Sequence, residues 1–349
     1  MQDVYSSDVA NNITIKYKGH NNIRGLYEVF ITLALYFATL LGTYWAYKHQ
    51  NWVLMLPFLF LNALSLVRIY ILEHDCSHGS LFPFKVLNLW AGRLISIITL
   101  TPFYAWRSKH LGHHKIVSNI QTRSTHKLVR KDIGYVLFYT VSEYQKKDKK
   151  NQLLYKLMCN PFLYYLILAP LYFIVVNRFP IDIADYPEEY RKKYVHSVLL
   201  TNLAVIPYYA LFLYFFGMQF LIVYLISLVL ATAYGTFLFQ VQHIFPETKF
   251  FANTDENVWN SVFITTSFYK LPRILDWFTC SIGYHHIHHL FPTIPGYNLK
   301  KCYEDNPILH TVNTVTMSDT LKIISLRLYD DIKLHRMLTW KDYFQHYSK

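Results

Sequence analysis

The sequence predicts an all-α integral membrane protein. We expect about four transmembrane helices in two hairpins, further interfacial helices, and a cytoplasmic helical cap that holds a di-metal site. Four apolar stretches are each long enough to cross a hydrocarbon core as a helix; they are residues 26–47, 52–72, 199–216 and 219–239. The chain also has 17 histidines, many of them clustered beside the ends of these stretches. Neutral imidazole is the commonest metal ligand in proteins.

Two other apolar segments are less suited to spanning. Residues 81–103 contain internal cations, and residues 153–176 contain Pro161 and Pro170. We therefore expect both segments to be interfacial or re-entrant. The N-terminus lacks the basic and short apolar regions of a secretory signal, so the first apolar stretch is expected to direct insertion. We treat residues 1–349 as one domain, with residues 1–25 as an N-terminal tail.

Composition narrows the class of protein further. The aromatic fraction is 18%, and many of these rings are expected in the interfacial belts of a membrane protein. The cysteines show no CxxC pairing, which argues against a disulfide framework and against a sulfur-ligated metal site. These isolated thiols are Cys76, Cys159, Cys280 and Cys302.

Positive charge is concentrated in one part of the chain. The formal net charge is +12, and residues 107–150 contain eleven Lys or Arg against three Asp or Glu. By the positive-inside rule this region is cytoplasmic. It would also suit anionic lipid head groups or an acidic protein partner. Nucleic acid is not expected, because no recognised binding module accompanies the charge.

Nine histidines occur at spacings that suit metal ligands. HDCSH places two imidazoles one helical turn apart, and HLGHH and HHIHH share the pattern HxxHH, which puts three imidazoles on one side of a helix. A solvated His tract is the alternative for GYHHIHHLFP alone, but a repeated HxxHH is hard to obtain by chance. One more histidine ends the fourth apolar stretch, as HDCSH ends the second. The candidate ligands are His74, His78, His110, His113, His114, His243, His285, His288 and His289.

Nine nitrogen ligands are too many for one ion. They predict two metals with four or five ligands each, and a nitrogen-rich site suits a borderline transition metal such as iron. We interpret the eight other histidines as surface residues or as residues behind the ligands, with His286 the doubtful member. They are His20, His49, His126, His196, His286, His310, His335 and His346.

Membrane topology follows from the requirement that all clusters share one site. An even number of crossings must separate consecutive clusters, so residues 81–103 cannot span. Of the three apolar stretches between His114 and His243, one must stay interfacial, and the proline-bearing residues 153–176 are the best candidate. The result is two hairpins, with both termini and all clusters on the cytoplasmic side.

These motifs also resemble a known family. HDCSH, HLGHH and HHIHHLFP look like the three histidine boxes of the membrane fatty acid desaturases. The stretches FQVQHIFPE and SFYKLPRILDWFTCSIGYHHIHHLFPTIPGYNL resemble the bacterial and plant-type acyl-lipid desaturases, the group with the Δ12 (omega-6) and bacterial Δ5 enzymes. The resemblance covers roughly residues 30–325. Any single HxxHH is weak, but the three boxes in order are specific.

The resemblance implies a non-haem di-iron oxidoreductase that uses dioxygen and two electrons to insert a cis double bond into a fatty acyl chain. It assigns His74 and His78 to the first box. The second box contributes His110, His113 and His114, and the third contributes His285, His288 and His289. His243 matches the additional ligand before the third box. Phe239 stands where a tenth, polar ligand would be, and Gln240 is a candidate substitute.

The resemblance also bears on partners. The chain has no haem-binding or cluster-binding motif, so electrons must come from a separate protein. The family's donors are ferredoxin and cytochrome b5, either of which would suit the basic residues 107–150. Asp75 and Glu247 are candidates for orienting ligand imidazoles, or else ordinary solvated carboxylates. Arg68 is charged within an apolar stretch, so we expect it to reach the interface or to meet an acyl head group.

Two alternatives remain open at this stage. A related di-iron lipid hydroxylase or oxygenase would carry the same boxes. A membrane metal transporter is a rival from another class, although it predicts ligands within the bilayer, whereas these clusters lie just outside the apolar stretches.

Overall fold

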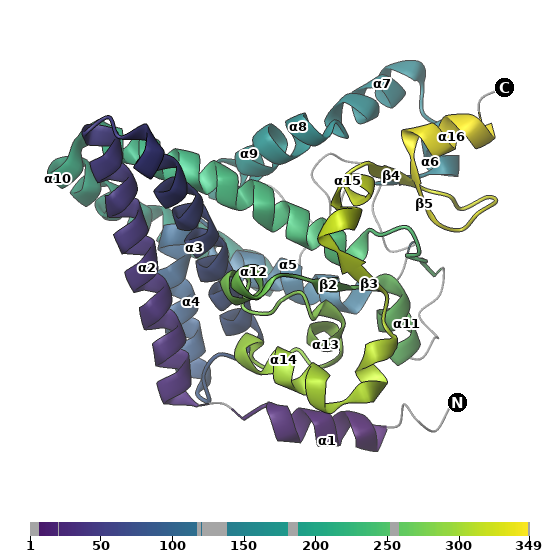
Figure 1. The fold of residues 1–349 in the computed structure, drawn as a ribbon, viewed down its shortest axis with the longest axis horizontal. Helices are drawn as coiled ribbons and strands as arrows, with labels where there is room; N and C mark the ends of the chain where they lie inside the picture. Colours follow the sequence, from purple (N-terminus) through teal and green to yellow (C-terminus); the bar gives the residue numbers. More distant parts are fainter. Residues whose placement is uncertain are drawn as a thin grey trace.

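The structure is a computed structural model that describes residues 7–19, 21–116, 120, 138–180, 188–251 and 258–347. Figure 1 shows the long helices gathered on one side and short helices and strands on the other. The first helices are α1 (Ser7–Tyr17), α2 (Asn22–Lys48), α3 (Trp52–His78), α4 (Lys85–Thr99) and α5 (Phe103–Ile116). Then follow α6 (Val141–Gln145), α7 (Lys149–Met158), α8 (Pro161–Leu163), the π-helix η2 (Tyr164–Leu168), α9 (Ala169–Ile174), the 3-10 turn η3 (Val176–Arg178) and α10 (Glu188–His243).

The C-terminal third consists of short elements. Its helices are α11 (Val258–Thr265), α12 (Arg273–Phe278), α13 (His285–Leu290), α14 (Gly296–Asp305), α15 (Thr320–Ile323) and α16 (Trp340–Tyr347), with 3-10 turns η4 (Pro307–Thr311) and η5 (Met317–Asp319). The strands are β1 (Tyr139–Thr140), β2 (Phe268–Lys270), β3 (Thr314–Thr316), β4 (Leu326–Tyr329) and β5 (Met337–Thr339). Strand β1 pairs with β4 in parallel and β4 with β5 antiparallel, while β2 pairs with β3 in parallel.

Among the described residues, four helical segments are long and apolar enough to cross a membrane. They are Asn22–Lys48, Trp52–His78, Pro161–Arg178 and Tyr190–His243. The prediction of an all-α membrane fold with about four spanning helices is confirmed. The short strands were not predicted, because segments of two to four residues carry too little sequence periodicity to be recognised.

The first predicted hairpin is formed by α2 and α3. The side chain of Asn51 caps α3 by accepting a hydrogen bond from the backbone N–H of Leu54. Midway along the pair, Asn62 Nδ2 donates to the backbone oxygen of Tyr36 at 2.9 Å. This satisfies polar groups that would be costly to bury unpaired in an apolar medium. The hairpin therefore returns the chain to the end at which α2 began.

The second predicted hairpin lies within α10. Gly217 has φ 74° and ψ −177°, a backbone conformation that is essentially restricted to glycine. The helix folds back on itself at this residue. This is shown by the rings of Tyr209 and Tyr224, which lie on opposite sides of Gly217 in the chain and have centroids only 5.4 Å apart. In a straight helix, 15 residues would separate them by about 22 Å. Residues 199–216 and 219–239 are thus the two arms of one hairpin.

Residues 81–103 do not carry the chain across the bundle. Helices α4 and α5 meet at a bend of 102°, at Leu100, which has φ 56°. The bend is tight because Gly92 lies against the ring of Phe103, so closely that a Cβ there would be 2.2 Å from a ring carbon. The chain enters beside α3 and comes back, which leaves His78 and His110 in contact. This supports the predicted re-entrant placement.

Residues 153–176 are more helical than predicted. Helix α7 presents Leu153 and Leu157 to the outside, as an interfacial helix would. The following segment, Pro161–Arg178, is long and apolar enough to qualify as a span. If all histidine clusters share one end of the bundle, a net crossing here would make the number of crossings odd. The interfacial or re-entrant placement therefore stays our prediction.

Arg68 differs from its predicted role. It is 3% exposed, so its guanidinium is not open to a lipid head group. Its guanidinium pairs with Glu28 of α2, donates to Thr32 Oγ1 at 2.9 Å, and donates to the backbone oxygen of Trp277 in α12. The sequence could not reveal this, because Glu28 lies 40 residues away and looks like an ordinary surface acid. Arg68 instead ties α12 to the first hairpin.

Candidate metal centre

Four elements bring the candidate ligands together. The C-terminal ends of α3 and α10 meet the short helices α5 and α13, which carry the two HxxHH motifs. In α5, His110 and His114 are one turn apart and face one group of ligands, while His113 faces the other. In α13, His285 and His289 face the second group, and only His288 faces the first group. Each motif thus contributes to both groups.

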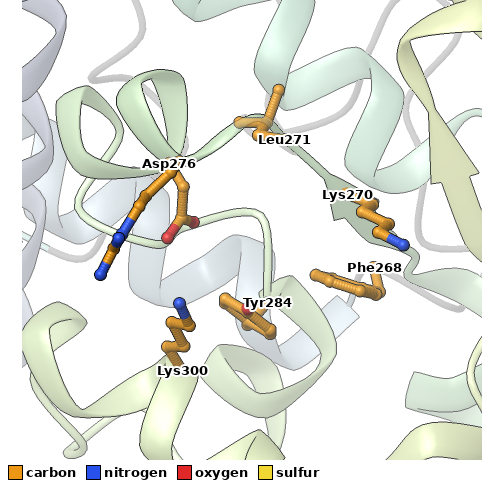
Figure 2. Close-up of a pocket in the computed structure, with 7 residues that line it drawn as sticks. Phe268, Lys270, Leu271, Asp276, Tyr284 and Lys300 are labelled. Carbon is orange, nitrogen blue, oxygen red and sulfur yellow. The ribbon is translucent and has the colours of Figure 1, made fainter.

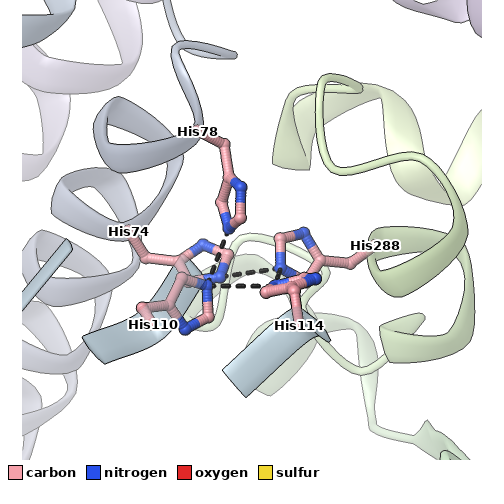
Figure 3. A group of neighbouring side chains, drawn as sticks. All are labelled: His74, His78, His110, His114 and His288. Carbon is pink, nitrogen blue, oxygen red and sulfur yellow. Dashed lines mark hydrogen bonds between the residues drawn. The ribbon is translucent and has the colours of Figure 1, made fainter. Parts of the chain in front are cut away.

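The first group has five members. Figure 3 shows imidazoles from α3, α5 and α13 pointing toward one another. The Nε2–Nε2 distances are 2.9 Å for His74 and His288, 2.7 Å for His78 and His110, 3.1 Å for His114 and His110, and 3.0 Å for His288 and His114. Two of the five, His78 and His114, are partly buried and the others are buried.

The second group has four members, all buried. Its Nε2–Nε2 distances are 3.0 Å for His113 and His243, 2.9 Å for His285 and His243, and 3.1 Å for His289 and His285. In both groups the ligand atoms lie within 4.8 Å of one another. All nine predicted residues are therefore brought together, in groups of five and four. Either group could hold a metal ion.

Hydrogen bonding alone does not explain these contacts. A neutral imidazole has one N–H and one lone pair, so a given Nε2 makes one hydrogen bond in one direction. Yet Nε2 of His110 lies close to Nε2 of both His78 and His114, and Nε2 of His288 approaches two partners in the same way. Ligands at 2.0–2.1 Å from a shared ion, 90° apart, would be about 2.8–3.0 Å from each other. The observed spacing fits coordination.

Neighbouring oxygens favour the tautomer that a metal needs. Nδ1 of His74 lies 3.2 Å from Asp75 Oδ1, and Nδ1 of His243 lies 3.2 Å from the backbone oxygen of Thr265. Donation from Nδ1 leaves the Nε2 lone pair free. Burial, reinforced by neighbouring imidazoles, lowers the pKa of His285, His288 and His289 well below the usual range. These rings are therefore neutral at pH 7, as ligands must be.

Aromatic rings border the ligands. Trp106 stacks on His110 with centroids 4.7 Å apart and planes 9° apart. Phe239 lies one turn before His243, and its ring centroid is 5.1 Å from that of His113 and 5.3 Å from that of His243. A hydrocarbon ring thus occupies the place where the resemblance implied a polar ligand.

The suggestion that Gln240 replaces that ligand is wrong. Its Oε1 accepts a hydrogen bond from the Tyr165 hydroxyl, and its Nε2 donates to the backbone oxygen of Ile323 at 2.9 Å. Both ends of the amide are therefore engaged away from the histidine groups. Gln240 follows Phe239 on the helix, so its side chain points about 100° further round the helix axis than the ring of Phe239.

The two carboxylates behave differently from each other. Asp75 is 3% exposed, faces His74 and accepts the backbone N–H of Gly296 at 2.8 Å, so it is placed to orient a ligand as predicted. Glu247 is exposed and is the solvated carboxylate of the alternative interpretation. The neighbouring Thr248 is buried, and its hydroxyl donates to the backbone oxygen of His243 and not to the imidazole ring.

The remaining histidines stay outside both groups. His20 and His126 lie outside the described residues. His286 is completely buried among Phe263, Phe268 and Tyr303, and burial lowers its pKa to about 3. It is therefore not a surface residue; it is a neutral core histidine behind the third motif. The four cysteines are free and buried, as their spacing predicted.

Part of the basic region is also different from expectation. Lys109 is 8% exposed and packs over the rings of Tyr172 and Tyr194, while Arg107 donates to the backbone oxygen of Ser77 at 2.6 Å. These two cations make contacts inside the protein that hold α5, the helix that carries the second motif HLGHH. Residues 117–119 and 121–137 of the region lie outside the described part of the chain.

Helix α13 is held by its surroundings. The turn before it contains Cys280 and Ser281, both at positive φ (47° and 57°), a strained conformation for residues other than glycine. A Cβ on Gly283 would be 2.5 Å from the backbone oxygen of Tyr269, and one on Gly296 would be 2.6 Å from that of Cys280. These close backbone contacts fix where the third motif starts. Sequence reasoning missed them, although both glycines flank the motif.

Fold and site together define a class: multi-pass helical membrane proteins in which histidines gather into two groups that could hold metal. Comparison with known proteins agrees. The family model described as "Fatty acid desaturase" matches residues 50–314. A "Fatty acid desaturase" of Bacillus subtilis is 36% identical over 283 residues, which cover 80% of this chain and 76% of that protein.

The chain belongs to the fatty acid desaturase family and is an oxidoreductase. A "sn-1 acyl-lipid omega-3 desaturase (ferredoxin)" of Synechocystis is 27% identical, covering 69% of this chain and 64% of the relative. A "Fatty acid conjugase FAC2 A" of Calendula officinalis is 23% identical, covering 81% and 76%. Membership of an enzyme family removes the transporter alternative.

Proposed function

We propose that this protein is an acyl-lipid desaturase that inserts a cis double bond into a fatty acyl chain at a di-iron centre. The observation that carries the proposal is the convergence of nine Nε2 atoms into groups of five and four. A donor set of imidazole nitrogens without thiolates suits iron, and iron is a metal that can react with dioxygen. The proposal assigns one iron to each group.

The overall reaction balances without any group beyond an electron donor. Two adjacent methylenes lose two hydrogens; with one dioxygen, two electrons and two protons they give one double bond and two waters. The irons, when bound, would supply activation of dioxygen, which ordinary acids and nucleophiles cannot provide. The chain's own residues hold the imidazoles in place: Asp75 orients His74 and the backbone oxygen of Thr265 orients His243.

The apolar neighbours of the ligands suit an acyl chain. Phe239 and Trp106 border the two groups and exclude water from the ligand rings. A dry surrounding protects a reactive centre from side reactions. We propose that the acyl chain reaches the histidine groups from the apolar side of the bundle, between helices that the membrane surrounds.

Electrons come from a separate protein in this proposal. The Synechocystis relative is named as a ferredoxin enzyme. A ferredoxin or cytochrome b5 would suit the exposed cations of residues 146–150, which are on the described part of the basic region. We place the histidine groups and both termini on the cytoplasmic side, where such donors are available, and treat residues 1–349 as one domain.

The names of the relatives differ in reaction outcome. The relative from Calendula is named a conjugase, so similar chains do not all carry names of one reaction. A related hydroxylase or oxygenase would use the same histidine groups. The product decides between the outcomes, because hydroxylation leaves a hydroxyl on a saturated carbon.

The test is expression in a host that lacks its own desaturase, followed by gas chromatography and mass spectrometry of the fatty acids. We expect a new cis double bond with the native chain and with His310→Ala, an exposed histidine outside both groups. His288→Ala should give no product. A hydroxylated chain would overturn the proposed reaction, and full activity of His288→Ala would overturn the proposed site.

A further inference from the structure

A cavity lies beside Tyr284, the residue that precedes α13. Its volume is about 260 Å³. Figure 2 shows it between β2 and α12 on one side and Tyr284 and Lys300 on the other. It is lined by Phe268, Lys270, Leu271, Arg273, Asp276, Tyr284 and Lys300.

The lining has an excess of positive charge. Lys270, Arg273 and Lys300 supply three cations, and Asp276 is the one carboxylate among the lining residues. That carboxylate already accepts a hydrogen bond from Ser281 Oγ at 3.1 Å. Lys300 has a weak ion pair with Glu304, at 3.8 Å and with both side chains about half exposed. The cavity therefore carries positive charge that its own acid does not neutralise.

The cavity sits where lipid head groups would be. Helix α12, which forms one wall, exposes Ile274 by 70% and Trp277 by 38% of their surfaces. Exposed tryptophan beside an exposed aliphatic residue and basic residues is typical of the membrane interface. The backbone oxygen of Trp277 is held by Arg68 from α3, one of the candidate spans. Helix α12 thus lies against the membrane bundle.

The cavity is also adjacent to the candidate metal centre. Tyr284 is 8% exposed and contributes its ring to the cavity wall. The next residue, His285, directs its imidazole into the second histidine group. A molecule with a polar end in this cavity would therefore have its attached chain close to the site.

We infer that this cavity binds the phosphate of the acyl carrier, and that Lys270, Arg273 and Lys300 hold it. This rests on the proposed function and deepens it, because it names a phosphate-bearing substrate. The phosphate has two sources, a phospholipid head group or the phosphates of a thioester carrier. Charge-assisted bonds from ammonium and guanidinium groups are the usual means of holding phosphate in proteins.

The first experiment measures binding without turnover. Purified protein in an uncharged detergent is titrated with dihexanoyl phosphatidylglycerol, and separately with a dihexanoyl galactosyl glycerol of the same chain length. We expect Lys300→Gln to raise the Kd for the phospholipid roughly fivefold, as one cation near a membrane surface would. The Kd for the galactolipid should not change. Lys341→Gln, an exposed lysine on α16, is the matched control.

The triple variant, with Gln at the three cationic positions, extends the test. Its phospholipid Kd should rise well beyond that of Lys300→Gln. An unchanged Kd, or an equal loss for the galactolipid, would overturn the inference. A variant that fails to fold is recognised by its elution on size exclusion, and the single variants then decide.

The second experiment identifies the source. Activity is measured with the same acyl chain on phosphatidylglycerol, on the galactolipid and on coenzyme A. For whichever phosphate carrier is desaturated, the variants should raise KM with kcat within roughly twofold, because the cations hold the polar end and not the reacting carbons. Efficient use of the galactolipid alone would contradict the inference. Phospholipid binding without product from any carrier would overturn the proposed function and leave the phosphate cavity standing.

Discussion

Helices α5 and α13 carry the same HxxHH motif but are supported in different ways. Helix α5 is 14 residues long and begins at Phe103, which packs on Gly92 of the preceding helix. Helix α13 has six residues and starts after the strained turn at Cys280 and Ser281. An isolated helix of six residues is not stable in water. Contacts from outside the helix must therefore hold α13.

The supports of α13 come from distant parts of the chain. Asp75 of the first motif accepts the backbone N–H of Gly296, just after α13, and Arg68 holds the backbone oxygen of Trp277, just before it. The comparison teaches that one ligand pattern can be placed by a longer helix that packs directly on its neighbours or by a very short helix held by contacts before and after it. Damage to the contacts before and after α13 should affect α13 and spare α5.

The largest effect is expected when a ligand is removed, whichever helix bears it. His110→Ala in α5 and His285→Ala in α13 should each lower activity at least roughly a hundredfold. Loss of a residue that only hydrogen-bonds to a metal ligand already costs up to about that much, and loss of the ligand itself should cost more. Because each helix serves both groups, we expect no difference between them. Product formation per protein, measured in membranes, checks this. Substantial activity in only one of the variants would break the proposed symmetry.

The next effect concerns the buried ion pair. Arg68→Met leaves Glu28 with the half-exposed Arg24 as its ion-pair partner, so the loss should stay below the roughly 3–5 kcal/mol that removal of one member of a buried pair costs. Thermal unfolding in detergent should show this loss. Hydrogen exchange should increase in α12 and α13 more than in α5.

A matched double variant, Arg68→Met with Glu28→Gln, tests the cause. It should recover part of the stability, because no uncompensated charge remains. If the double variant is less stable than Arg68→Met alone, the charge explanation is wrong.

Glycine substitutions give a smaller and more selective effect. A Cβ on Gly283 would be 2.5 Å from a backbone oxygen, whereas one on Gly112, inside the second motif, meets nothing within 4 Å. Gly283→Ala should therefore cost about 1–3 kcal/mol and reduce bound metal. Unfolding curves and metal analysis of the same samples provide the measurement. Equal behaviour of the two variants would contradict the proposed difference in support.

The smallest effect is a gain. Gly112→Ala should stabilise the protein by up to about 1 kcal/mol, because alanine is favoured over glycine inside a helix. Activity should be retained within about twofold. A clear loss of activity would show that α5 needs conformational freedom at Gly112, and the expected difference from Gly283 would then be wrong.

Much of this site could be predicted from the sequence. All nine ligand candidates follow from the sequence, eight from the spacing within the three motifs and His243 from its place at the end of an apolar stretch. The hairpins follow from hydropathy, whereas the role of Gly217 at the turn of the second comes from its backbone conformation. Local periodicity and membrane length are properties of neighbouring residues, so they are readable without a structure.

The remaining features depend on contacts between distant residues. The pairing of Arg68 with Glu28, the burial of His286 and the engagement of Gln240 with Tyr165 have no local signature. Which of two carboxylates, Asp75 or Glu247, faces a ligand also depends on the tertiary fold around the histidines. A division into four and five ligands was predicted, but which ligand belongs to which group became apparent only when α5 and α13 were placed together.

The central claim is that nine imidazoles hold two irons. Iron analysis of the purified chain, with Mössbauer spectroscopy of ⁵⁷Fe-enriched protein, tests it most directly. The account predicts two irons per chain in nitrogen-rich environments, which are distinguishable because one group has five ligands and the other four. A single iron, or iron that stays bound at the native ratio when His288 and His285 are both replaced by alanine, would contradict it.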